Sequence, residues 1–148
     1  MELSISHSTD TDRWLQERHY LHSTPAGAVL RMEFREAGEL IGAMMWGRSP
    51  SPKQDQKSLL CLTRMYFIDE APKNTESRAL AMARRYIRRH CPEIKGLVAY
   101  SSTGQGHEGT VYQADNWFEV SRSRAARDTR PGRKNLDTSI KIKWCRSP

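Results

Sequence analysis

The stretch Leu59–Ile68, which reads LLCLTRMYFI, is the feature that most constrains the fold of this chain of 148 residues. The side chains on both faces of this stretch are largely apolar. A strand with one solvent-exposed face instead alternates apolar and polar residues. A strand that is covered on both faces lies inside a sheet with other elements packed on each side. The stretch therefore predicts a central strand.

A long amphipathic helix is expected shortly after this strand. Asn74 is a good N-cap, the pattern continues through His90, and Pro92 ends it. Leu80, Ala83 and Ile87 fall on one stripe, which we expect to be buried. The arginines of the helix are expected to lie largely away from that stripe; they are Arg84, Arg85, Arg88 and Arg89.

Alternation and turn residues predict the other elements of an α/β (α+β) domain. The expected strands are Glu2–Ser6, Ala28–Glu36, Glu39–Trp46, Leu97–Ser101, Trp117–Ser121 and Ser139–Cys145. The expected helices, besides the long one, are Asp10–His19 and Thr110–Asp115. The second and third strands should form a hairpin across the turn Ala37-Gly38, and the last strand should close the sheet.

Length and composition indicate a single domain over residues 1–148, with 37% hydrophobic and 28% charged residues. No apolar run approaches the roughly 20 residues of a membrane span, and the first residues do not resemble a secretory signal. Three cysteines without a CxxC spacing favour reduced thiols in the cytoplasm, and neither they nor the histidines predict a metal site. The chain has no GxSxG, GxxxxGK[ST] or HExxH motif.

Positive charge is concentrated near the C-terminal end. The formal charge of the chain is +7, and Arg122–Arg146 alone contains nine Lys or Arg and two Asp. Ser121–Lys134 has few apolar residues, so we expect a mobile basic loop at about 121–135 that binds a nucleic acid; a loop that only aids solubility is the alternative. The expected contact residues are Arg122, Arg124, Arg127, Arg130, Arg133 and Lys134.

The junction between the central strand and the long helix is the first candidate site. Free N–H groups at a helix start favour anions, and Lys73, Arg78 and Arg64 would add cationic donors. An ordinary capped helix, with Glu76 stabilising its first turn, explains the same residues.

Two further segments could contribute chemistry. A loop with Gly104, Gly106 and Gly109 carries His107 and leads to Tyr112, which could serve a leaving group or could be a core tyrosine. His19 and Tyr20 follow the first helix and could contact an acceptor; the alternative is a buried Tyr20 beside an exposed His19.

The order of elements resembles the acyl-CoA N-acyltransferase (GNAT) architecture, a mixed, mostly antiparallel sheet that is flanked by helices and splayed at its central strands. The resemblance implies that the strand–helix junction holds the cofactor's pyrophosphate, that a tyrosine near position 112 lies close to the leaving thiolate, and that the donor is acyl-CoA-like. The usual QxxGxG pattern of that junction is missing here.

The strings LTR, APKNTESRALA, IKGLVAYS and GHEGTVYQADNW, together with HYLHSTPAG, resemble the Mom family of phage DNA-modification proteins. The resemblance covers about His19 to Trp117 and implies an enzyme that converts adenine in DNA to a carbamoylmethyl-type derivative. It places the active site on Tyr20, Arg64, Ser77 and Tyr112, with other residues nearby: His19, Asn74, Arg78, Tyr100 and His107. Ser102 stands where family members often have Asp.

The leading hypothesis is therefore a transferase that modifies the exocyclic amine of adenine in double-stranded DNA and protects phage DNA from restriction in the host cytoplasm. It predicts a flipped base that stacks on Tyr20 or Tyr100, with Ser102, His107 and Asn116 as further DNA contacts. The identity of the donor stays unknown and a homodimer stays possible. The alternatives are a GNAT acetyltransferase for a protein or small amine, and a non-catalytic DNA-binding relative.

Overall fold

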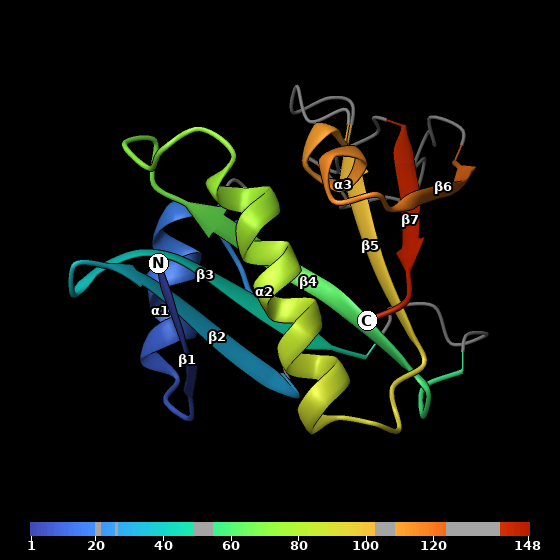
Figure 1. Ribbon diagram of the computed structural model, residues 1–148, viewed down its shortest axis with the longest axis horizontal. Helices are drawn as coiled ribbons and strands as arrows, with labels where there is room; N and C mark the ends of the chain where they lie inside the picture. The colour runs from blue at the N-terminus through green and yellow to red at the C-terminus, as the bar shows by residue number, and fades with distance from the viewer. Residues whose placement is uncertain (20–21, 26, 49–54, 103–108, 124–139) are drawn as a thin grey trace, which may run out of the picture.

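The computed structural model describes residues 1–19, 22–25, 27–48, 55–102, 109–123 and 140–148. In them, seven strands form one sheet in the order β1-β2-β3-β4-β5-β7-β6 (Figure 1). The strands are β1 (Glu2–Ser6), β2 (Leu30–Glu36), β3 (Glu39–Gly47), β4 (Leu59–Phe67), β5 (Gly96–Ser102), β6 (Phe118–Arg122) and β7 (Lys141–Arg146). The helices are α1 (Asp10–Arg18), α2 (Thr75–His90) and α3 (Thr110–Ala114).

The predicted mixed sheet is confirmed: β4 and β5 are parallel, and every other pair of neighbouring strands is antiparallel. The central position of the LLCLTRMYFI strand and the β2–β3 hairpin are also confirmed. The last strand does not close the sheet, because β7 inserts between β5 and β6 and leaves β6 at the edge. Pairing between segments that are distant in sequence decides this order, and no local pattern encodes it.

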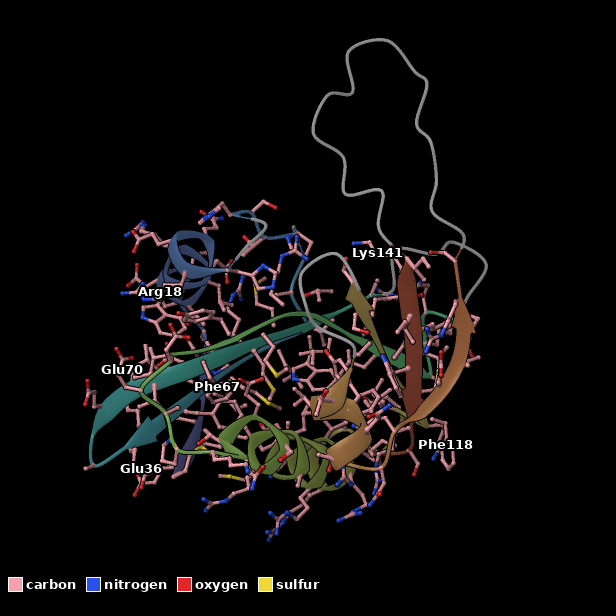
Figure 2. All side chains as sticks on the ribbon, turned by 90° about the horizontal axis from the view of Figure 1, so that it is seen from above. Arg18, Glu36, Phe67, Glu70, Phe118 and Lys141 are labelled. Carbon is pink, nitrogen blue, oxygen red and sulfur yellow. The ribbon has the colours of Figure 1, made fainter. Side chains whose placement is uncertain are left out.

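Helices cover both faces of the sheet (Figure 2). One face packs on α2 through a large core that includes Leu80, Ala83 and Ile87, as the stripe predicted. The opposite face packs on α1 through a smaller cluster around Leu15 and Met45. None of the helices in the described ranges is long and apolar enough to cross a membrane.

The pairing of β4 with β5 ends halfway along the two strands. Leu59 pairs with Gly96 and Leu62 with Ala99, and beyond that point the described part of β4 pairs with β3 and that of β5 with β7. Thr63 is an extra residue in β4, since Trp46 pairs with Leu62 whereas Met45 pairs with Arg64. A bulge of this kind bends a strand and increases its twist. The two strands therefore diverge, and the start of α2 and α3 face each other across the opening (Figure 1).

A buried ion pair joins the two helices beside the opening. Arg84 of α2 donates two hydrogen bonds to the carboxylate of Asp115, at 2.7 and 2.6 Å, and the two side chains are 11% and 5% exposed. The indole N–H of Trp117 donates to the same carboxylate at 2.8 Å. The expectation that Arg84 lies away from the buried side of its helix is therefore wrong. Its partner lies 31 residues away, so the helical pattern alone could not identify it.

We expect Asp115→Ala to lower the free energy of unfolding by about 3–5 kcal/mol, because it leaves the charge of Arg84 buried without its partner. Asp10→Ala is the matched control, since Asp10 pairs with Arg13 on the exposed surface of α1 and should contribute at most about 1 kcal/mol. Urea denaturation of both variants checks this. Equal losses in the two variants would show that the buried pair does not stabilise the fold.

Candidate functional site

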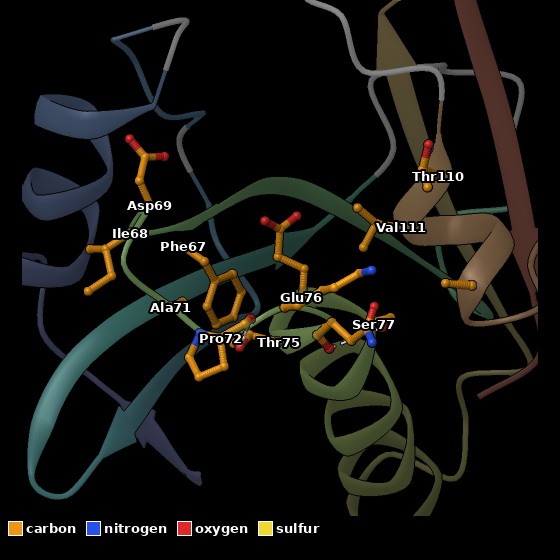
Figure 3. A pocket seen from close by; sticks show the side chains of 13 residues that line it. Phe67, Ile68, Asp69, Ala71, Pro72, Thr75, Glu76, Ser77, Thr110 and Val111 are labelled. Carbon is orange, nitrogen blue, oxygen red and sulfur yellow. Dashed lines mark hydrogen bonds between the residues drawn. The ribbon is translucent and has the colours of Figure 1, made fainter.

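A cavity of about 330 Å³ lies in the opening between β4 and the helices α2 and α3 (Figure 3). Its wall follows the chain from the end of β4 into the first turn of α2 and is completed by the start of α3. The lining residues are Phe67, Ile68, Asp69, Ala71, Pro72, Lys73, Asn74, Thr75, Glu76, Ser77, Thr110, Val111 and Ala114. The junction that the sequence predicts as an anion site is thus one side of a real cavity.

The chain enters α2 through Asn74, which has a left-handed conformation with φ 67° and ψ 11°. Asparagine tolerates this conformation better than most residues, so Asn74 makes the sharp turn that a glycine often makes. The prediction that its side chain caps the helix is wrong, since the side chain makes no capping hydrogen bond. Its carbonyl oxygen instead accepts hydrogen bonds from the N–H of Arg78 and the hydroxyl of Ser77, both at 3.1 Å.

Charges of both signs line the cavity. Lys73 and the first turn of α2 contribute positive charge, whereas Asp69 and Glu76 contribute carboxylates. Figure 3 shows the Glu76 side chain pointing into the space between β4 and α3. The sequence predicts only that Glu76 stabilises the first turn of the helix. The direction of its side chain depends on how α2 packs on the sheet, which the sequence does not show. Lys73 and the first turn of α2 can therefore attract an anionic group, whereas Asp69 and Glu76 repel one.

The opposite wall depends on a close approach between Gly109 and Trp144. Gly109 has φ +82°, and a Cβ atom at this position would lie 2.2 Å from Cζ2 of Trp144. Only glycine fits there, and from it α3 begins, so that Thr110 and Val111 reach the cavity.

Tyr112 follows on α3 with its ring buried, at 8% exposure. The ring stacks on Trp144 at a centroid distance of 5.9 Å and meets Trp117 edge-on at 5.4 Å. Its packing thus matches the core alternative, and its neighbour Val111, rather than Tyr112, lines the cavity. Tyr112 nevertheless directly follows the lining residue Val111 in the sequence of α3.

Arg64 lies on the other face of β4. Its guanidinium donates to the carbonyl oxygen of Ser23 at 2.8 Å and to that of Thr63 at 2.6 Å, and it does not line the cavity. Arg64 thus connects the segment after α1 to the bulge in β4. His19 at the end of α1 is buried, so the alternative in which His19 is exposed is wrong. Tyr20 lies outside the described residues.

The remaining predicted residues occupy several places. Tyr100 and Ser102 lie on the half of β5 that pairs with β7 but not with β4, and the first is half-buried and the second buried. Arg78 is exposed and does not line the cavity, whereas Ser77 does. Asn116 forms a turn with φ 61°, and Arg122 on β6 forms an ion pair with Glu119. The candidates His107, Arg124, Arg127, Arg130, Arg133 and Lys134 lie outside the described residues, as does most of the predicted basic loop.

The cysteine nearest to the opening is not an activated nucleophile. Burial raises the pKa of the Cys61 thiol to about 11, although the positive charges of Lys143 and Arg64 act in the opposite direction. A thiol with this pKa is ionised in only about one molecule in a thousand at pH 8. Cys61 is therefore not a candidate nucleophile.

Several solved acetyltransferases have a similar fold, although they are distant in sequence. A GNAT acetyltransferase from Streptococcus pneumoniae has a TM-score of 0.65 at 9% identity and is matched over 99% of both chains. The ribosomal-protein-S18-alanine N-acetyltransferase from Escherichia coli has a TM-score of 0.67 at 11% identity, over 99% of this chain and 92% of that one. A Bacillus subtilis acetyltransferase in complex with CoA has a TM-score of 0.69 at 7% identity, over 99% and 98%. The fold is thus that of the GNAT class.

The sequence narrows this class to one family. A family model for the Mom protein family matches residues 2–146, and the chain belongs to that family. One curated relative, the methylcarbamoylase mom of Escherichia phage Mu, is 28% identical over 111 residues, which is 70% of this chain. The match spans 46% of the length of that relative.

We expect Glu76→Gln to strengthen the binding of coenzyme A about fivefold, because a carboxylate near an anionic ligand costs about 1 kcal/mol in water-like surroundings. Isothermal titration calorimetry measures this. Glu93→Gln, in the exposed segment after α2, is the control and should bind like the parent. An unchanged affinity in Glu76→Gln would show that the carboxylate does not face the bound ligand.

Proposed function

We propose that the protein is a DNA-modification transferase that attaches a carbamoylmethyl-type group to the exocyclic amine of adenine in duplex DNA, and that this protects phage DNA from restriction in the host cytoplasm. The observation that carries the proposal is the Mom family match over nearly the whole chain, together with a cavity between the end of β4 and the starts of α2 and α3. The relative's name supports transfer of a carbamoyl-containing group.

The cavity side of the sheet is the donor side. The donor, which is acyl-CoA-like by fold, supplies an activated carbon with a leaving group when it is bound. Lys73 and the first turn of α2 bind its anionic part, and Ser77 orients it. In the transfer, the adenine nitrogen forms a bond to the methylene carbon of the donor's carbamoylmethyl group. The bond between that carbon and the leaving group breaks, the leaving group takes the electron pair, and the amine proton passes to water. The hydroxyl of Tyr112 donates a proton to the leaving group.

The opposite side of the sheet is the acceptor side. His19 ends α1, and Arg64 on β4 donates to Ser23 in the segment after α1. Tyr100 lies on the half of β5 that does not pair with β4. Tyr20 follows His19 in the sequence and lies outside the described residues. An adenine that is flipped out of the duplex can approach the opening from here and stack on an aromatic ring. Holding the amine and the donor close is required, because the lone pair of the amine is conjugated into the ring and makes it a poor nucleophile.

Nucleoside mass spectrometry of host DNA after expression of the protein tests the proposal. A modified deoxyadenosine that carries the mass of a carbamoylmethyl group is the expected result. Unmodified DNA together with turnover of acetyl-CoA on an amine would instead identify a GNAT acetyltransferase. Unmodified DNA with tight DNA binding and no turnover would identify a non-catalytic relative.

We expect Tyr112→Phe to lower the yield of modified deoxyadenosine at least about 100-fold, since proton transfer by a positioned side chain contributes about 10²–10⁴-fold. The substitution keeps the ring that packs between Trp117 and Trp144 and removes only the hydroxyl. Tyr86→Phe is the matched control, because Tyr86 is a partly buried tyrosine of α2 that does not line the cavity, and this variant should modify DNA like the parent. Parent-like activity in Tyr112→Phe would remove Tyr112 from the reaction.

A further inference from the structure

A row of lysines lies on the acceptor face of the sheet, outside the site described so far. Lys141 and Lys143 alternate on β7 with Ile142 and Trp144, which are buried in the core on the α2 side. The two lysines therefore point to the opposite face. In the antiparallel register Lys143 pairs with Tyr100 and Lys141 with Ser102, so the two lysines lie beside the half of β5 that does not pair with β4.

Positive charge dominates this face. The charges of both Lys143 and Arg64 act on the buried thiol of Cys61, which places the two cations around one part of the sheet. The strands β4, β5 and β7 contain no Asp or Glu. Glu119 on β6 pairs with Trp144, so its side chain belongs to the opposite face, where it forms an ion pair with Arg122. The described residues of β4, β5, β6 and β7 thus present cations on this part of the face without carboxylates.

An exposed aromatic side chain continues the same face. Phe118 at the start of β6 is 73% exposed and pairs with Cys145, two residues along β7 from Lys143. With Val98, Cys145 and Lys143 it borders a shallow depression of about 370 Å³. Exposed aromatic rings beside cations are typical of surfaces that bind nucleic acids.

We propose that duplex DNA docks on this face of β5, β7 and β6, where Lys141 and Lys143 bind backbone phosphates and Phe118 contacts a base or sugar. The inference rests on the proposed function, because a duplex in this position brings an adenine to the opening between β4 and β5. Residues two apart on a strand are separated by about 7 Å, which corresponds to about two phosphates along one DNA strand. The two lysines can therefore bind different phosphates.

Fluorescence anisotropy with a labelled duplex, over a series of salt concentrations, tests the docking face. For Lys141→Gln/Lys143→Gln we expect the slope of log K against log salt to become shallower by about 1.8, because each lost phosphate contact removes about 0.9. Phe118→Ala should weaken binding about fivefold or more and keep the slope, since stacking does not release counterions.

Two control variants separate charge from position. Arg85→Gln/Arg89→Gln removes the same charge from the exposed side of α2, on the other side of the sheet, and should bind DNA with the parent's slope. Lys141→Arg/Lys143→Arg keeps the charge on β7 and should also keep the parent's slope. That result would show that the slope changes in the glutamine variant because charge is lost, and not because the protein is misfolded. A parent-like slope in the lysine double variant, or an equal loss in the α2 variant, overturns the proposal.

The proposed docking face and the proposed reaction can be rejected independently of each other. A shallower slope in a protein that yields no modified deoxyadenosine keeps the docking face and rejects the proposed reaction. Modified deoxyadenosine at the parent's level from the lysine double variant, with an unchanged slope, rejects the docking face alone. Tighter binding of an acidic peptide than of the duplex, lost in the same variant, would assign this face to a protein partner and overturn the proposal.

Discussion

The divergence of β4 from β5 is the constraint on which the rest of the structure depends. Parallel strands normally keep their ladder, but the extra residue Thr63 bends β4 away after Leu62. The backbone groups beyond this point lose their partners in the neighbouring central strand and become available to a ligand. The cavity beside the starts of α2 and α3 lies on the α2 side of the sheet, whereas Arg64 contacts the segment after α1 on the opposite side.

Buried polar contacts and tight aromatic packing keep the opening in shape. Asp115 connects Arg84 on α2 with the turn that follows α3, and Arg146 donates to the carbonyl oxygens of Asp115 and Asn116 at 2.8 and 3.1 Å. Gly109 lets α3 start directly against Trp144. These contacts fix the distance between the two walls of the cavity, which is what a group-transfer site requires of its scaffold.

The elements of this fold could be predicted from the sequence because their patterns are local: LLCLTRMYFI reads as a buried strand, and the stripe of Leu80, Ala83 and Ile87 as one face of a helix. What the sequence could not reveal depends on contacts between distant segments. The sequence pattern predicts Arg84 as a surface residue, and only the fold shows that it pairs with Asp115. No local sequence pattern indicates that β7 lies between β5 and β6. The orientation of Glu76 into the cavity and the row of Lys141 and Lys143 follow from the same long-range arrangement.

Blocking the cavity tests most directly whether the chemistry takes place in the opening. Thr110 lines the cavity from the exposed start of α3, so Thr110→Trp should fill it, whereas Gln113→Trp places the same ring on an exposed position of α3 outside the cavity. The decisive measurement is the fraction of modified deoxyadenosine in DNA from cells that express each variant. The account predicts that modification falls at least about 100-fold in Thr110→Trp and persists in Gln113→Trp, with DNA binding kept in both. Full modification by a folded Thr110→Trp protein would contradict it.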